Sequence, residues 1–154
     1  MSNHALFSPS DAHRWTKCHA SVQYRDIETP MSASAKRGAK MHRIAASMLE
    51  RYLSPAMPKE FGRIGHVMEK YIRDYVNSVN KIDFDKILVE HRVFFGDEIK
   101  QSNHNCFGTV DAVTYKHSTK ELFVIDFKTG SEAIPATNNL QLLLYAVGCL
   151  RRFP

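Results

Sequence analysis

The sequence has few cysteines, no long apolar run and no internal repeat. Its three cysteines, Cys18, Cys106 and Cys149, lie far apart in 154 residues, which argues against a disulfide framework and against a CxxC zinc site. We therefore expect reduced, buried thiols. No apolar run approaches the ~20 residues of a membrane-spanning helix, and the N-terminal stretch MSNHALFSPSDAHRW lacks the apolar centre of a signal peptide. These absences predict a cytoplasmic protein without membrane contact.

Charge is present but unevenly distributed. The chain carries 21 basic and 16 acidic residues, a formal net charge of +5. Residues 1–80 hold 12 basic and seven acidic side chains, whereas residues 81–154 hold nine of each. A basic half beside a neutral half suits a polyanionic partner such as DNA.

The first 80 residues are predicted to be mainly helical. Ser8 is typical of an N-cap and is followed by proline, so a short helix is expected through Trp15. Apolar residues with helical spacing predict two longer helices, over 32–54 and over 61–79. The positions expected to be buried in them are Met41, Ile44, Ala45, Met48, Leu49, Tyr52, Leu53, and then Ile64, Val67, Met68, Tyr71, Ile72, Tyr75, Val76.

The rest of the chain changes its period. Three segments rich in β-branched and aromatic residues, 87–95, 107–115 and 121–128, are predicted strands. A last helix is expected from Asn138 to about Leu150, capped by Thr137 or Asn138, with an apolar stripe of Leu140, Leu143, Leu144 and Val147. The order of helices, three strands and a helix predicts one α+β domain over residues 1–154, helical in 1–80 and with its sheet and last helix in 81–154.

The third strand ends in the stretch VIDFKTG, which carries an acid and a base two residues apart on one face, Asp126 and Lys128. A turn centred on Ser118 and Thr119 places Asp111 of the second strand directly opposite Asp126. Two carboxylates so close repel one another unless a divalent cation lies between them, and Mg²⁺ prefers such oxygen ligands. The plainer interpretation is a salt bridge or a solvated cluster of charges at a strand end.

Other groups extend this hypothetical site. The ammonium of Lys128 would stabilise charge on a phosphate or hold an attacking water, and the carbonyl oxygen of Phe127 would add a metal ligand. Gln141 and Tyr145 lie four residues apart and share a face of the last helix, where an amide beside an aromatic ring suits contact with a nucleic-acid strand. The alternative for this pair is a helix flank with a half-exposed tyrosine.

These motifs together resemble those of RecB-type nucleases in the PD-(D/E)XK superfamily. The matching stretches are Gly38-Ala39-Lys40-Met41-His42, Gly108-Thr109-Val110-Asp111, Asp126-Phe127-Lys128 and Gln141-x3-Tyr145, preceded by SPSDAHRWTKC, which is similar to the start of a RecB-like phage and prophage family. The resemblance implies a restriction-endonuclease-like core and a Mg²⁺- or Mn²⁺-dependent nuclease that hydrolyses phosphodiester bonds in DNA. By analogy it is an exonuclease of phage recombination or DNA processing in a bacterial cell. The resemblance also allows a recombination protein as a partner.

The resemblance also implies a role for each matching residue. Asp111, Asp126 and His42 would bind the metal, and Lys128 would assist the attack of water. Gln141 and Tyr145 would position the DNA strand.

Several features depart from that family pattern. His66 also fits the G-x-x-x-H motif and competes with His42, and Glu90 of the first strand is a candidate accessory ligand. Some members of the family that the motifs resemble hold an iron–sulphur cluster on one early and three late cysteines. Cys18 matches the early cysteine, but the chain has no late triplet, so no cluster is expected. The final core strand of the superfamily has no counterpart after the last helix, which predicts a truncated or minimal version. Two alternatives therefore stay open: a degenerate nuclease-like module that binds DNA or a partner protein, and an unrelated α+β domain with surface charges.

Overall fold

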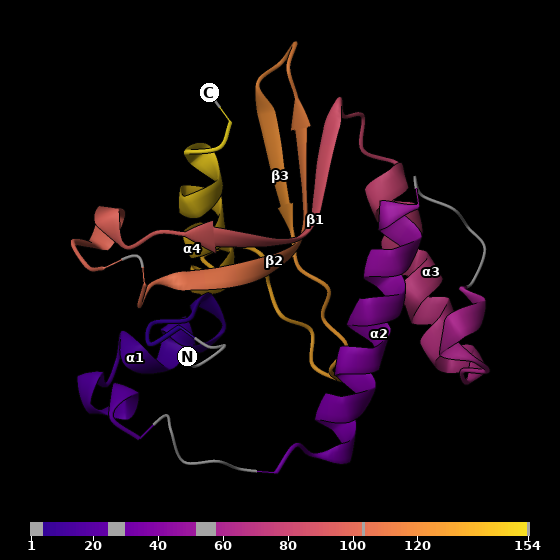
Figure 1. Ribbon diagram of the computed structural model, residues 1–154, viewed down its shortest axis with the longest axis horizontal. Helices are drawn as coiled ribbons and strands as arrows, with labels where there is room; N and C mark the ends of the chain where they lie inside the picture. The colour runs from indigo at the N-terminus through magenta and orange to yellow at the C-terminus, as the bar shows by residue number, and fades with distance from the viewer. Residues whose placement is uncertain (1–4, 25–29, 52–57, 103, 154) are drawn as a thin grey trace. The chain divides into compact units, whose positions relative to one another are not determined.

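The computed structural model describes residues 5–24, 30–51, 58–102 and 104–153 (Figure 1). In chain order its elements are α1 (Ala12–Trp15), α2 (Ala33–Glu50), α3 (His66–Asn80), β1 (Lys86–Phe94), β2 (Phe107–Lys116), β3 (Glu121–Ile125) and α4 (Leu140–Leu150). The predicted α+β class is confirmed, because helices accompany an antiparallel sheet with the strand order β1-β2-β3. No helix in the described part of the chain is both long and apolar enough to cross a bilayer.

The chain divides into two compact units. The first comprises Met1–Pro30, His91–Val110 and Ile134–Pro154, and the second comprises Met31–Glu90 and Asp111–Ala133. β1 and β2 each contribute residues to both units, whereas α2, α3 and β3 belong to the second.

The β2–β3 hairpin has the predicted register. Ala112 pairs with Ile125 and Lys116 with Glu121, so the connecting loop is centred on Ser118 and Thr119 as expected. The predicted length of the third strand was wrong, however, because β3 ends at Ile125 and not at 128. Beyond that point the N–H of Phe127 donates to the side chain of Asp111 instead of to a strand carbonyl, which ends the ladder.

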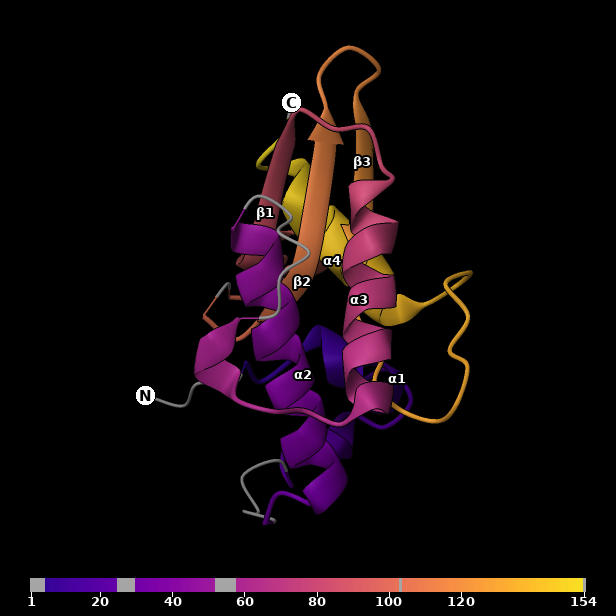
Figure 2. The same ribbon diagram turned by 90° about the vertical axis from the view of Figure 1, so that its right-hand side faces the viewer.

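The core of the second unit lies between a helix pair and the hairpin. Helices α2 and α3 run side by side (Figures 1 and 2), and their apolar faces enclose Ala112 of β2 and Phe127. The residues of the two helices in this cluster are Met41, Ile44, Ala45, Met48, Leu49, Ile72, Tyr75, Val76 and Val79. The predicted stripe of α2 is confirmed within the described residues, and its Tyr52 and Leu53 lie outside them.

Two predictions for α3 were wrong. The helix begins at His66 and not at 61, because Gly62 has a positive φ of 63° and Gly65 takes the N-cap position. The predicted buried stripe also included Val67 and Tyr71, which are 66% and 58% exposed. They lie four residues apart on the flank of the buried helix face that Ile72, Val76 and Val79 form.

In the first unit, residues of the opening SPSDAHRW motif contact one another. Ser8 occupies the N-cap position of a 3₁₀ turn, but its hydroxyl donates to the Asp11 carboxylate at 3.1 Å and caps no backbone N–H. The indole of Trp15 donates to the Ser8 carbonyl at 2.8 Å. A Cβ on Gly108 would lie 2.7 Å from a ring carbon of Pro9, so this motif glycine permits close approach.

The fully buried residues of helix α4 are not those of the predicted stripe, of which Leu144 and Val147 are half-buried. Its buried residues are Tyr145, Gly148 and Cys149, while Leu140 and Leu143 of the expected stripe are 40% and 54% exposed. The cap prediction was also wrong by one residue, because the Asn139 side chain accepts from the N–H of Leu142. Among the thiols, Cys106 and Cys149 are buried as expected, but Cys18 is exposed.

Candidate metal centre

Asp111 is the fixed point of the candidate site. It directly precedes Ala112, the first residue of β2 that pairs with β3, and its side chain is mostly buried. Its Oδ2 accepts the Phe127 N–H at 2.5 Å, and its Oδ1 lies 3.0 Å from Nδ1 of His42 on α2. A carboxylate that accepts two such bonds from separate elements is held in one orientation. The second unit therefore presents Asp111 and His42 to the same small volume.

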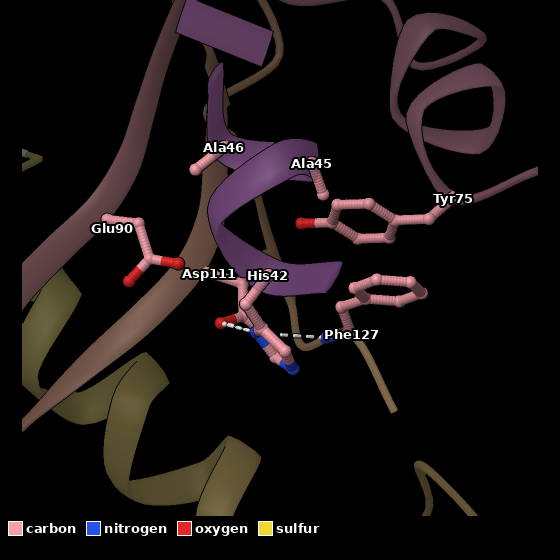
Figure 3. A pocket seen from close by; sticks show the side chains of 7 residues that line it. All are labelled: His42, Ala45, Ala46, Tyr75, Glu90, Asp111 and Phe127. Atoms are coloured by element: carbon pink, nitrogen blue, oxygen red, sulfur yellow. Dashed lines mark hydrogen bonds and ion pairs between the residues drawn. The ribbon is translucent and has the colours of Figure 1, made fainter. Parts of the chain in front are cut away.

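A third potential ligand joins this pair. One ligand atom from each of His42, Glu90 and Asp111 can be chosen so that all three lie within 4.8 Å of one another. Figure 3 shows the three side chains converging from α2, β1 and β2. The hydrogen bond with Asp111 is the main cause that raises the pKa of His42, and the charge of Asp111 adds to it, against the opposing effect of burial.

Glu90 has an unusual backbone for a residue within a strand. Its φ is 45°, in the left-handed region that residues other than glycine rarely adopt. Residues held in such conformations are concentrated at functional sites, where the surrounding structure maintains them. Desolvation raises the pKa of the Glu90 carboxyl, and the nearby charge of Asp111 raises it further, so two acids compete for the same space.

Asp126 and Lys128 form a pair of their own. Lys128 Nζ lies 2.7 Å from Asp126 Oδ2, and the Asp126 side chain is only 10% exposed. Burial raises the pKa of Asp126, and the bond from Lys128 lowers it in part. Asp126 is not a member of the three-ligand group, in which Glu90 accompanies Asp111 and His42.

The loop that carries Lys128 is packed closely against α2. A Cβ on Gly38, the glycine of the G-x-x-x-H motif, would lie 2.9 Å from Oγ1 of Thr129. Phe127 is buried, and its ring contacts two other rings. It stacks on Tyr75 with centroids 4.5 Å apart and is tilted against His42 with centroids 5.3 Å apart. The glycine thus lets the Lys128 loop and the His42 helix approach each other.

The donor set fits a divalent cation. An imidazole nitrogen and two carboxylate oxygens suit Mn²⁺ and, through the oxygens, Mg²⁺. Octahedral Mg²⁺ binds ligands at about 2.1 Å, so adjacent ligand atoms must be about 3 Å apart. Side chains whose ligand atoms are already within 4.8 Å reach that spacing by small rotamer adjustments.

An open pocket adjoins the cluster on the outer side of α2. It has a volume of about 540 Å³ and is lined in part by His42, Arg43, Phe61 and Glu90. The exposed side of α2 also carries a series of basic residues, Lys36, Arg37, Lys40 and Arg43, with no acidic residue before Glu50. Among the residues that the structure describes, none of these four forms an ion pair.

Three other predicted residues are not members of the three-ligand group. His66 is exposed at the start of α3 and does not join the three-ligand group, whereas its competitor His42 does. Gln141 and Tyr145 belong to the first unit. There Gln141 Nε2 lies 3.4 Å from the Tyr145 hydroxyl, and the Tyr145 ring is 4% exposed and packed beside Gly108.

The sequence pattern predicts only an accessory role for Glu90 and a core position for Tyr75. Tyr75 lines the small pocket beside His42, Glu90 and Asp111, with its hydroxyl inside the protein. No local pattern distinguishes a buried tyrosine hydroxyl from an exposed one. The left-handed backbone at Glu90 likewise has no signal in the surrounding residues.

The chain belongs to the family described as Protein of unknown function (DUF2800), which matches residues 4–154. No solved structure matches the chain.

Proposed function

We propose that this DUF2800 protein is a divalent-metal-dependent nuclease that hydrolyses phosphodiester bonds in DNA. The observation that carries the proposal is the convergence of His42, Glu90 and Asp111 within 4.8 Å. The Asp126–Lys128 pair of the same compact unit supports it, since an ammonium beside a metal can stabilise the charge that develops on a reacting phosphate.

The charges of this unit argue for a cation at the site. Burial raises the pKa values of Glu90 and Asp126, and the nearby charge of Asp111 raises both further. A phosphodiester would be repelled from three carboxylates, because unit charges a few ångströms apart in a partly buried site interact by several kcal/mol. Mg²⁺ or Mn²⁺ held by these oxygens reverses the sign of the interaction, so that acidic residues and an anionic substrate share one site.

Each residue then has a definite task. His42, Glu90 and Asp111 hold the ion, which supplies charge neutralisation and an activated water when bound. The Phe127 N–H keeps Asp111 in its orientation by a hydrogen bond at 2.5 Å. Lys128 reaches the attacking water or the phosphate when it leaves Asp126, and Asp126 keeps the ammonium positioned until then.

The basic side of α2 suits the DNA backbone. Four basic residues on one helix, without ion-pair partners among the described residues, attract phosphates, and the open pocket of about 540 Å³ leaves room beside the metal ligands. Digestion from a strand end, in phage or prophage DNA processing, follows from the resemblance to RecB-type nucleases, as does contact of Gln141 and Tyr145 with the strand.

The test is digestion of end-labelled linear duplex, single-stranded and circular DNA with Mg²⁺, Mn²⁺ or EDTA. Wild type is compared with Lys128→Ala and with Lys81→Ala, an exposed lysine at the end of α3. We expect metal-dependent cleavage by wild type and by the Lys81 variant. The Lys128 variant should lose at least about 100-fold in rate, as expected for a group that acts in general acid–base or electrostatic catalysis.

The outcomes separate the alternatives. Loss of linear but not circular DNA indicates an exonuclease. A gel shift without metal-dependent digestion at high protein concentration refutes the nuclease and favours the DNA-binding module. If there is no digestion and no gel shift, the protein is an unrelated domain whose charges are surface features.

A further inference from the structure

Tyr75 buries a hydroxyl group that the fold does not use. The residue lies on α3 with 8% exposure, and its ring stacks on Phe127 with centroids 4.5 Å apart and planes at 17°. Its hydroxyl is buried and has no hydrogen-bond partner among the residues that the structure describes. Figure 3 shows this oxygen pointing into the pocket that Glu90 and Asp111 line from the other side.

Packing alone does not account for this hydroxyl. A phenylalanine would provide the same stacking on Phe127, and a buried polar group without a partner is unfavourable. The pocket is also too tight for a free water molecule to satisfy it. The hydroxyl therefore needs a partner that the pocket itself supplies in another state of the protein.

The partner must accept a hydrogen bond. Burial, followed by the charges of Asp111, Glu90 and Asp126, raises the pKa of Tyr75 far above its usual value, so the hydroxyl keeps its proton and acts as a donor. The carboxylate of Asp111 already accepts from His42 and from a backbone N–H. The exposed side chain of Glu90 has no hydrogen bond or ion pair with any side chain in the described ranges, and its carboxylate therefore has acceptor capacity left.

We propose that Tyr75 is a positioning residue of the metal site, whose hydroxyl donates a hydrogen bond to the Glu90 carboxylate when a divalent cation draws the ligand atoms together. The inference rests on the proposed metal-dependent function. Ligating carboxylates are held by hydrogen bonds from a surrounding layer of groups, and such groups contribute to metal affinity without touching the ion. The left-handed backbone of Glu90 and the unsatisfied hydroxyl of Tyr75 are both unfavourable in the metal-free protein. Both belong to the pocket beside which the cation would bind.

The test compares Tyr75→Phe with Tyr71→Phe, which removes a hydroxyl one turn earlier on the same helix from a side chain that is 58% exposed. Mn²⁺ affinity is measured by calorimetry or by the electron paramagnetic resonance signal of free Mn²⁺, and thermal stability is measured in EDTA. We expect the Tyr75 variant to bind Mn²⁺ about 10-fold more weakly. In EDTA its Tm should rise by about 2–6 °C, because an unsatisfied buried group has been removed. The Tyr71 variant should match wild type in both measurements.

A second variant identifies the partner. In a Glu90→Ala background, which removes the acceptor oxygens, the further change Tyr75→Phe should weaken Mn²⁺ binding by less than about 2-fold, because contacting residues are non-additive. In cleavage assays the Tyr75 variant should need more Mn²⁺ for half-maximal rate and should regain the wild-type kcat at saturating metal.

The results separate this inference from the function on which it rests. If wild type binds no Mn²⁺, the metal-dependent function fails and Tyr75 loses its role with it. If wild type binds Mn²⁺ and the Tyr75 variant binds it equally well, only the role of Tyr75 is refuted. A lower Tm in EDTA with unchanged Mn²⁺ affinity would show a purely structural hydroxyl and would also refute it. Equal losses from Tyr75→Phe in the wild-type and Glu90→Ala backgrounds would refute the assigned partner.

Discussion

Asp111 offers the sharpest test of the site, because it joins the hairpin to α2 and is also a proposed metal ligand. Its two oxygens accept from the Phe127 N–H at 2.5 Å and from His42 at 3.0 Å. Asp111→Ala removes both bonds and the charge. Asp111→Asn keeps the shape and one acceptor oxygen but removes the charge. The two variants therefore separate the structural role of Asp111 from its role as a ligand.

The magnitudes follow from the partners. A hydrogen bond from a backbone N–H to a charged acceptor contributes about 2 kcal/mol. The bond with the partly exposed His42 contributes about 1 kcal/mol, and relief of repulsion with Glu90 returns about 1 kcal/mol. Asp111→Ala should thus lower the free energy of unfolding by about 2 kcal/mol, or Tm by about 4–8 °C for a chain of this length. Asp111→Asn should stay within about 1 kcal/mol of wild type.

The assay is urea or thermal unfolding in EDTA, followed by Mn²⁺ binding and DNA digestion by the same preparations. Both variants should lose Mn²⁺ binding and cleavage, although only Asp111→Ala is clearly destabilised. Wild-type stability of Asp111→Ala would refute the structural reasoning. Wild-type Mn²⁺ affinity of the folded Asp111→Asn variant would refute the assignment of Asp111 as a ligand.

Three further predictions concern other parts of the chain. Because Asp111 raises the pKa of His42 above 6.5, their pair stabilises the metal-free protein below that pH, and this contribution is lost as pH rises through the raised pKa. Mn²⁺ affinity should strengthen over the same pH interval, since the ion competes with the proton for His42. Titrations at about pH 6 to 9 check both trends, and a stability and a Mn²⁺ affinity that rise or fall together with pH would contradict them. Gly108→Ala should lower the free energy of unfolding by about 3 kcal/mol in urea, because its Cβ would lie 2.7 Å from a proline ring carbon, whereas Gly130→Ala, with open space around it, should change it by less than about 0.5 kcal/mol. Exposed Cys18 should react rapidly with a thiol reagent, while Cys149, whose pKa burial raises to about 11, should react only on unfolding; rapid labelling of both would contradict the packing of α4.

The register of the hairpin was predictable because it depends on local chain geometry. A four-residue loop centred on Ser118 and Thr119 determines which residues pair, and the observed pairs follow it. The end of β3 was not predictable in the same way. It depends on the side chain of Asp111 accepting the Phe127 N–H, a contact 16 residues distant that no period in the sequence encodes.

The helix faces show a similar division. The stripe of α2 was predicted well because the part of the helix from Met41 onward, which contains all of its buried residues, packs against one apolar layer. Periodicity predicts that a helix has an apolar face but does not say how wide the covered part of that face is. Tyr71 is therefore exposed although it shares the period of buried Ile72 and Tyr75, and α4 buries Tyr145 and not its leucine stripe.

The candidate site is where local rules and the observed structure disagree most. Carboxylates crowd together there, a glutamate within a strand has left-handed φ, and a tyrosine hydroxyl is buried without a described partner. A sequence shaped only by stability would remove each of these features by a single substitution, such as Tyr75→Phe. Their coincidence in one pocket of one compact unit has a common physical explanation. The proposed divalent cation would neutralise the carboxylates and make Glu90 a ligand, and Glu90 would then accept a hydrogen bond from the hydroxyl. The metal-bound state would thus satisfy groups that the metal-free state leaves unsatisfied.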